Sequence, residues 1–305
     1  MKEMVQIPEC FKAKARRQFG KKGPEWVNSL AGTLSECVDR WSLSDLVVVG
    51  DLSVNFLCYA TSKHGDVVLK ISGPHSERYT EMIALTLYDG RHACRCLESD
   101  RELGAMLLER IRPGHCLRSA VPKDEQLRIG AQLVRDLPIP IETNVPLPSY
   151  SDWIERAIRT VHTEYRPSQE LRKTLDAALQ LFTEIPNSNR CLLHGDLHHD
   201  NVLLASDGGW KAIDPQGVIG APVLECGRFI QNHVVCNDNV LDLHEAEATI
   251  DYMAGVLEQE PRLVSIAFLV LHVLSVCWGF EMNYTAERQQ KGVEQCAALL
   301  GIIPD

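Results

Sequence analysis

The sequence is short of basic residues, and this shortage limits the partners that the protein can have. Its 305 residues include 31 Lys and Arg against 41 Asp and Glu, which gives a formal net charge of −10. Binding to duplex nucleic acid rests on Lys and Arg at the phosphates, so we expect no nucleic-acid partner. The charge favours cationic small molecules only weakly, because an acidic balance also keeps proteins soluble.

Three further features are missing from the sequence: a C-x-x-C pair, a signal peptide and a second long apolar run. The eleven cysteines form no C-x-x-C pair, which is typical of reduced, buried thiols. Residues 1–7 carry charges and no apolar core, so we expect no signal peptide and a cytoplasmic location. A single apolar run, residues 263–280, is long enough to just span a bilayer, and no second run exists. We interpret it as the buried helix of a helical domain and expect no membrane partner.

The residues that carry chemistry surround an expected hairpin. Two short apolar runs, 202–205 and 210–213, flank the turn Ser-Asp-Gly-Gly. Asp-Gly and Gly-Gly pairs supply the positive φ angles of tight turns, so the outer ends of the two runs should meet. Asp196 and Asn201 precede the first run and Asp214 follows the second. Three oxygen-bearing side chains are therefore expected at one end of the hairpin.

This set of side chains fits phosphoryl transfer. Amide and carboxylate oxygens bind Mg²⁺ together with phosphate, so Asn201 and Asp214 are the predicted metal ligands. Asp196 is then available to orient a substrate hydroxyl and to accept its proton. His-x-Asp-x-x-x-x-Asn followed by a second Asp is also the protein kinase pattern of catalytic Asp, metal-binding Asn and metal-binding Asp. His194 is expected to have a structural role only.

The stretch from His194 to Leu204, followed by Asp214-Pro215-Gln216-Gly217, resembles the aminoglycoside/hydroxyurea antibiotic resistance kinases, the group that contains the streptomycin phosphotransferases. The resemblance covers most of the chain. It implies an α+β, protein kinase-like fold with an antiparallel β-sheet lobe that carries helices and a mainly α-helical lobe. It also implies Mg²⁺ and ATP as cofactors, with GTP as the alternative nucleotide.

Upstream of this stretch the sequence predicts a β-rich region. Apolar runs predict strands over residues 46–49, 54–61, 66–72, 91–97 and 104–108. Lys70 lies inside the third strand, where a buried Lys is costly unless a carboxylate or phosphate pairs with it. It matches the nucleotide-binding Lys of the kinase Val-Ala-Ile-Lys strand. Glu81, on a helix expected over 76–88, is the favoured partner, and Glu77 is the alternative.

Two weaker nucleotide contacts come from loops. The turn at residues 50–53 contains one Gly, and no G-x-G-x-x-G is present, yet in a kinase-like lobe this turn, with Ser53, would cover the phosphates. Pro113 and Gly114 mark a break in the chain after the last strand. In the kinase-like fold that the resemblance implies, this linker offers backbone groups to adenine. The resemblance therefore implies Glu109 and Ile111 as backbone contacts.

The pattern divides the chain into three regions. An N-terminal helical extension over 1–43, packed on the N-terminal lobe, is followed by that lobe over 44–109 and by the helical lobe over 110–305. Helices of the last region are predicted over residues 124–137, 150–165, 167–182, 224–235, 242–258, 263–280 and 284–300. Related kinases often have an acid near Glu225 that anchors the catalytic loop. We expect a monomer or a weak dimer.

The resemblance implies phosphorylation of a hydroxyl of an aminoglycoside such as streptomycin, or of hydroxyurea. Several acids offer contacts to a cationic substrate, although solvated helix faces explain most of them: Asp238, Asp242, Glu245, Glu247 and Glu281. A metabolic kinase for an amino alcohol or a sugar would share the same catalytic stretch. Gln216 stands where relatives often have Lys, which leaves the substrate open.

Two other functions compete with a kinase. A zinc hydrolase is suggested by the donor cluster His194, Asp196, His198, His199 and Asp200, with His233 and His244 as distant ligands. That alternative leaves Lys70, Glu81, Asn201 and Asp214 unexplained, and we assign no chemistry to His198, His199 and Asp200. A catalytically inert nucleotide-binding module is the third candidate. The presence of every key acid and of the Lys argues against it.

Overall fold

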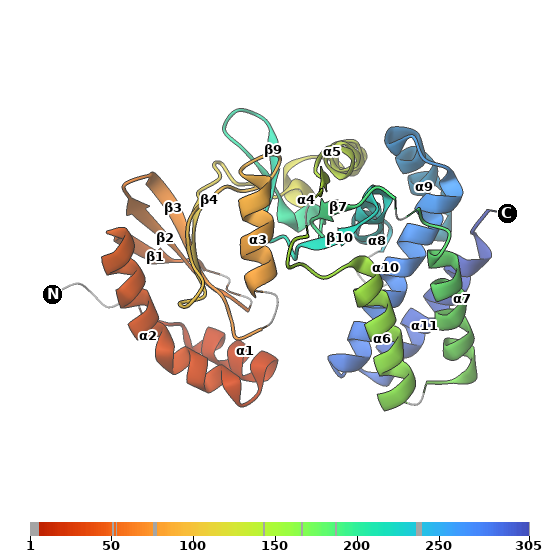
Figure 1. Ribbon diagram of the computed structural model, residues 1–305, viewed down its shortest axis with the longest axis horizontal. Coiled ribbons are helices and arrows are strands. Elements are labelled where there is room, and N and C mark those ends of the chain that lie inside the picture. The colour runs from red at the N-terminus through yellow and green to blue at the C-terminus, as the bar shows by residue number, and fades with distance from the viewer. Residues whose placement is uncertain are drawn as a thin grey trace. The chain divides into compact units, whose positions relative to one another are not determined.

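The computed structural model describes residues 6–50, 52, 54–75, 78–142, 144–165, 167–186, 188–235 and 240–304. The chain forms two compact units (Figure 1). The first comprises Met1–Gly114 with Ala205–Lys211, and the second comprises His115–Leu204 with Ala212–Asp305. Ser53, Ser76, Glu77 and Asp238, which the sequence analysis singled out or placed in predicted elements, lie outside the described residues.

The first unit is built on a five-stranded antiparallel sheet with the order β1-β2-β3-β5-β4. The strands are β1 Ser44–Val48, β2 Phe56–Ser62, β3 Gly65–Ile71, β4 Cys96–Asp100 and β5 Ala105–Glu109. Side chains alternate between the faces of a strand, so Val67, Leu69 and Ile71 enter one core while Lys70 belongs to the opposite face. This alternation positions the lysine that the sequence analysis selected.

Helices cover this sheet. α1 Glu9–Phe19 and α2 Lys22–Trp41 contribute Phe11, Leu30 and Leu34 to the same apolar cluster as the sheet (Figure 1). The N-terminal extension is therefore part of the first unit and packs on its sheet. α3, Arg78–Tyr88, carries the predicted partner of Lys70.

Two expectations for this unit differ from the structure. The strand predicted over residues 91–97 is β4, Cys96–Asp100, because the polar residues expected to form a turn lie on an edge strand, where charged side chains are tolerated. The first unit also continues to Gly114 rather than ending at Glu109. The linker stays with the sheet because Arg112 binds Asp66 and the Arg110 guanidinium lies 3.7 Å from the ring centroid of Tyr59.

The second unit is mainly helical. Its α-helices are α4 Leu117–Ala120, α5 Lys123–Asp136, α6 Tyr150–Glu164, α7 Gln169–Phe182, α8 Cys226–Val234, α9 Leu243–Leu257, α10 Pro261–Glu281 and α11 Ala286–Gly301. α10 contacts α6, α7, α8, α9 and α11, which explains why it is apolar all round. It is long and apolar enough to cross a membrane, and 78% of its most apolar window is buried in the protein, as in a core helix.

Short strands of the second unit frame the catalytic stretch. β6 Ile139–Pro140, β7 Cys191–Leu193 and β10 Val218–Gly220 form an antiparallel sheet with the order β10-β7-β6. The predicted hairpin is confirmed, since β8 Val202–Leu204 pairs with β9 Trp210–Ala212. A 3₁₀ turn, η1 His199–Asn201, precedes it, and a second, η2 Pro222–Glu225, leads into α8.

Candidate active site

The segment after β7 is fixed by the strand beside it. Leu193 pairs with Val218, and the backbone N–H groups of Gln216 and Gly217 donate to the His194 carbonyl at 2.8 and 3.2 Å. Gly195 has φ of +78°, and a Cβ there would lie 2.9 Å from the Trp153 ring. Only glycine fits this left-handed, crowded position without strain. The backbone conformation just before Asp196 is therefore fixed.

A buried carboxylate also anchors this loop. Glu225 accepts hydrogen bonds from the N–H groups of His194 and Gly195 at 2.5 and 3.2 Å, and it is 2% exposed. Burial raises the pKa of Glu225 to about 7, while the two backbone donors act in the opposite direction. The anchoring acid suggested by the sequence is therefore present at this position.

His194 has a structural role, as expected. Its Nε2 lies 2.9 Å from the Ile213 carbonyl oxygen, and its Nδ1 accepts the Asp196 N–H at 3.3 Å. The neutral ring with the proton on Nε2 satisfies both contacts. Burial lowers the pKa of His194 to about 4, which keeps the ring neutral. The imidazole thus ties the start of the loop to the end of the hairpin.

The hairpin arranges the three predicted active-site residues. The Asn201 side-chain NH₂ donates to the Asp196 carbonyl at 3.0 Å, and the Ile213 N–H donates to the Asn201 carbonyl at 2.8 Å. Asp214 follows directly, with an exposed side chain and φ of +58°. The Asn201 amide oxygen makes no hydrogen bond with any residue that the structure describes. An amide oxygen and an exposed carboxylate are donors that fit Mg²⁺.

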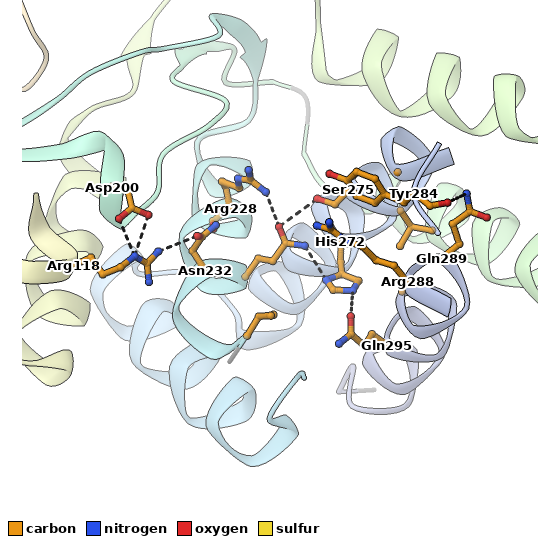
Figure 2. Close-up of a pocket in the computed structure, with 15 residues that line it drawn as sticks. Arg118, Asp200, Arg228, Asn232, His272, Ser275, Tyr284, Arg288, Gln289 and Gln295 are labelled. Carbon is orange, nitrogen blue, oxygen red and sulfur yellow. Dashed lines mark hydrogen bonds and ion pairs between the residues drawn. The ribbon is translucent and has the colours of Figure 1, made fainter. Parts of the chain in front are cut away.

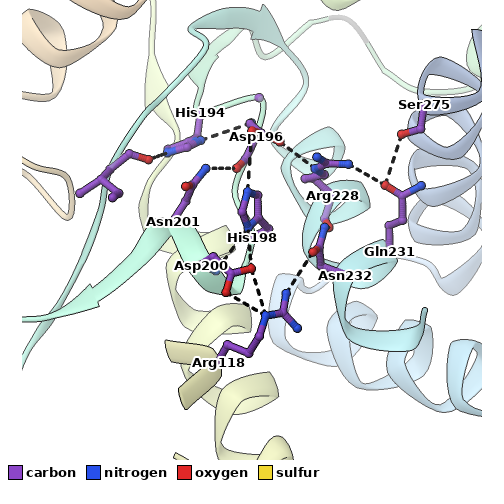
Figure 3. A network of polar contacts seen from close by, with 12 residues as sticks. Arg118, His194, Asp196, His198, Asp200, Asn201, Arg228, Gln231, Asn232 and Ser275 are labelled. Carbon is purple, nitrogen blue, oxygen red and sulfur yellow. Dashed lines mark hydrogen bonds and ion pairs between the residues drawn. The ribbon is translucent and has the colours of Figure 1, made fainter. Parts of the chain in front are cut away.

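Arg228 of α8 holds the Asp196 side chain (Figure 3). Its Nε donates to Asp196 Oδ1 at 2.7 Å, and its Nη1 donates to Gln231 Oε1 at 2.9 Å. Ser275 of α10 also donates to Gln231 Oε1, at 3.2 Å. The carboxylate thus has one oxygen fixed by a guanidinium that is itself held in place. No sequence motif identified Arg228, although its i, i+3 spacing with Gln231 places both residues on one face of the helix.

Both histidines after Asp196 make contacts within the protein. His198 Nδ1 accepts the Asp200 N–H at 3.3 Å, and its Nε2 lies 3.8 Å from Asp196 Oδ2. His199 is buried, stacks on Phe229 at 4.2 Å between ring centroids, and lies 3.2 Å from His233. Burial lowers the pKa of His199 to about 3. His244 is exposed on α9. Within the described ranges no three His, Cys, Asp or Glu side chains form a group that could hold a metal, so the donor geometry does not support the zinc hydrolase.

In the first unit the predicted ion pair is formed. Lys70 Nζ lies 2.6 Å from Glu81 Oε1, and the two side chains are 2% and 7% exposed. The Glu109 side chain instead accepts from Lys211 at 2.5 Å and from the Arg95 N–H at 2.8 Å. The Glu109 N–H donates to the Arg95 carbonyl. The Glu109 carbonyl, which also accepts from the Cys94 thiol at 3.6 Å, is the backbone group of this residue that a ligand could use. The Ile111 N–H donates to no acceptor among the described residues.

Two of the acids suggested for a cationic substrate have other partners. Asp242 caps α9 by accepting the Glu245 N–H at 3.0 Å. The Glu245 carboxylate forms an ion pair with Lys123. These contacts leave less negative charge for a bound cation than the sequence suggested.

The sequence matches a known family of proteins. The family model of the aminoglycoside/hydroxyurea antibiotic resistance kinases matches residues 40–282. Streptomycin 6-kinase of Streptomyces glaucescens is 28% identical over 229 residues, which cover 72% of this chain and 73% of that protein. Hydroxyurea phosphotransferase of Kitasatospora aureofaciens is 29% identical over 235 residues, 73% of this chain and 67% of that protein.

A solved structure shows the fold. Choline kinase LicA from Streptococcus pneumoniae superposes with a TM-score of 0.64 at 14% identity, covering 90% of this chain and 99% of that one. LicA has also been solved in complex with AMP. The likeness confirms the predicted fold, a protein kinase-like arrangement with a β-sheet N-terminal lobe and a helical C-terminal region.

Proposed function

Because the chain belongs to the aminoglycoside/hydroxyurea antibiotic resistance kinase family, we propose that it transfers the γ-phosphate of ATP to a hydroxyl of a small molecule, with Asp196 as the base. One observation carries the assignment of the base. Asp196 stands on a loop fixed by Glu225 and His194, with one carboxylate oxygen held by Arg228 at 2.7 Å. The side chain is 23% exposed, and its second oxygen, Oδ2, lies 3.8 Å from His198 Nε2. That distance is longer than a hydrogen bond, so an acceptor hydroxyl can bind this oxygen.

The proposed step needs little covalent chemistry from the protein. The acceptor hydroxyl donates a hydrogen bond to Asp196 Oδ2, its oxygen forms the new bond to the γ-phosphorus, and the bond to the leaving oxygen of the diphosphate breaks. The hydroxyl proton passes to the Asp196 carboxylate as the new bond forms. Arg228 keeps the carboxylate in place during this transfer, and general-base assistance of this kind contributes roughly 10² to 10⁴-fold.

The remaining predicted residues receive nucleotide roles in the proposal. Asn201 and Asp214 would hold Mg²⁺, which when bound neutralises charge on the phosphates. Lys70, oriented by Glu81, would bind phosphate oxygens, and the Glu109 carbonyl and Ile111 N–H would bind the base. ATP is the nucleotide we propose first, with GTP as the alternative. We place the enzyme in the cytoplasm, as a monomer or weak dimer.

The names of the relatives indicate which acceptors to test first, namely streptomycin and hydroxyurea. Amino alcohols and sugars form a second set, because a metabolic kinase would use the same catalytic residues. The purified protein is incubated with Mg²⁺, ATP and each acceptor, and mass spectrometry detects the gain of one phosphate. An Asp196→Asn variant should lose roughly 10² to 10⁴-fold in rate.

Asp251→Asn provides the matched control, because Asp251 is an exposed carboxylate on α9 outside the site. It should match the parent protein. Equal rates for the parent and the Asp196→Asn variant would remove Asp196 from its role. An absence of transfer to every acceptor would revive the inert nucleotide-binding module.

A further inference from the structure

A cavity of about 520 Å³ lies in the second unit, and Arg228 is one of its lining residues (Figure 2). Its walls come from α8, α10 and α11, with Arg118 and Asp200 at one end. The volume falls in the range of about 300–1,000 Å³ that is typical of small-molecule sites. Arg228 lines the cavity and also binds Asp196 Oδ1, so a molecule held here would lie next to the proposed base.

The charges around this cavity are mainly positive. Arg118, Arg228 and Arg288 line it, and Asp200 is the one carboxylate among its described lining residues. Asp200 is already neutralised, because both of its oxygens accept from Arg118 Nε at 2.8 and 3.0 Å. Among the lining residues that the structure describes, no carboxylate is left for an ammonium or guanidinium group.

Arg288 is the charge in the wall that lacks an acid. It stacks over the Tyr284 ring, with its Cζ 3.8 Å from the ring centroid, and forms no ion pair with a described residue. Its side chain is exposed at the start of α11. The other two arginines of the wall are bound to Asp196 and Asp200. An acidic group on a ligand would therefore find its partner at Arg288.

The rest of the wall suits hydroxyl groups. Gln231, Asn232, Gln289 and Gln295 contribute amides. Each amide already makes a hydrogen bond within the protein, and a ligand would use the remaining N–H groups and oxygen lone pairs. His272 lies between Gln231 and Gln295, at 3.0 and 3.1 Å from their side chains, and burial lowers its pKa to about 4. The imidazole is thus neutral and adds no negative or positive charge to the cavity.

We propose that this cavity binds the acceptor, and that the acceptor is a hydroxyl-bearing molecule without a cationic group, either neutral or acidic. The inference rests on the proposed function, which supplies Asp196 as the base at its edge. It departs from the expectation of a cationic substrate. Of the two acceptors named by the relatives, neutral hydroxyurea agrees with the wall, and streptomycin, which carries guanidinium groups, does not.

Binding is measured by calorimetry without nucleotide, on the full chain. The probes are hydroxyurea, streptomycin and three sets of sugars that share ring and hydroxyls and differ in one group: neutral, carboxylate-bearing and amino-bearing. We expect the neutral or acidic compounds to bind and the amino-bearing ones to bind at least tenfold more weakly. A preference for streptomycin or for amino sugars, or no binding by the neutral and acidic sets, overturns the proposal.

Variants locate the effect in the cavity. Arg288→Gln should weaken the binding of acidic ligands about fivefold, which is the scale of a solvent-accessible ion pair. The binding of neutral ligands should stay unchanged. Arg288→Glu should admit amino-bearing ligands. Arg159→Gln, an exposed arginine on α6 that does not line the cavity, should change neither. Equal effects of the Arg288 and Arg159 variants would also contradict the assignment.

The two proposals fail in different ways. Binding of neutral or acidic compounds without phosphate transfer would count against the proposed function. Asp196-dependent transfer to an amino-bearing acceptor would confirm the function and count against this inference alone.

Discussion

A predicted active-site residue takes part in an ion pair in each unit, and the two pairs differ in burial. Lys70 and Glu81 lie 2.6 Å apart with side chains 2% and 7% exposed. Arg228 and Asp196 lie 2.7 Å apart with side chains 30% and 23% exposed. A buried charge depends on its partner, because losing that partner leaves it unsolvated. A half-exposed carboxylate can exchange its contacts with water or with a substrate. The first pair therefore supports the fold, and the second remains open to chemistry.

The largest effect is expected from the buried pair. Glu81→Leu should lower the free energy of unfolding by about 3–5 kcal/mol, because it removes the Glu81 carboxylate from the buried Lys70 ammonium. The double variant Lys70→Met with Glu81→Leu should recover much of this loss while staying inactive. Urea unfolding measures both. If the double variant were no more stable than Glu81→Leu alone, the pair would not be coupled as described.

Glu225 extends this comparison to a buried carboxylate that has no cationic partner among the residues that the structure describes. Its pKa rises from 4.5 to about 7 in the folded protein. The folded state therefore holds a proton that the unfolded state releases, so this group's contribution to stability falls as pH rises from about 4.5 to about 7. The loss is roughly 3 kcal/mol at one pKa unit per 1.36 kcal/mol.

Glu225→Gln should remove this part of the pH dependence, because the amide does not ionise. Unfolding curves at several pH values between the two pKa values measure the slope for the parent and the variant. An unchanged slope in Glu225→Gln would show that other groups carry the dependence.

The half-exposed pair should give the smallest change in stability. Arg228→Met is expected to lower the free energy of unfolding by about 0–1 kcal/mol, the usual range for a solvent-accessible ion pair. Its turnover should fall nonetheless, since the Asp196 carboxylate loses the group that orients it. Thermal unfolding and initial rates measured on one preparation separate the two effects. A variant that unfolded early and kept its turnover would reverse the roles assigned to the two pairs.

Local patterns in the sequence were enough for much of this account. The hairpin followed from Asp-Gly and Gly-Gly between two apolar runs, and Lys70 and Glu81 followed from a strand and the next helix. The β10-β7-β6 sheet was not predicted because strands of two or three residues are too short to show an alternation. The edge strand β4 was misplaced because its polar residues read as a turn.

The cavity could not be predicted for a different reason. Its wall combines three arginines from elements far apart in the sequence: Arg118 of α4, Arg228 of α8 and Arg288 of α11. Counting acids along the chain suggested a cationic substrate. The local charge of the wall is opposite to the net charge of the chain, and only the fold reveals it.

The most direct test of the central claim is a single-turnover measurement with saturating nucleotide and an identified acceptor, made on the parent protein and on Asp196→Asn. If Asp196 acts on the acceptor hydroxyl, nucleotide affinity stays unchanged while the transfer rate falls roughly 10² to 10⁴-fold. A variant that transfers phosphate at the parental rate, or that loses nucleotide binding instead, would contradict the account.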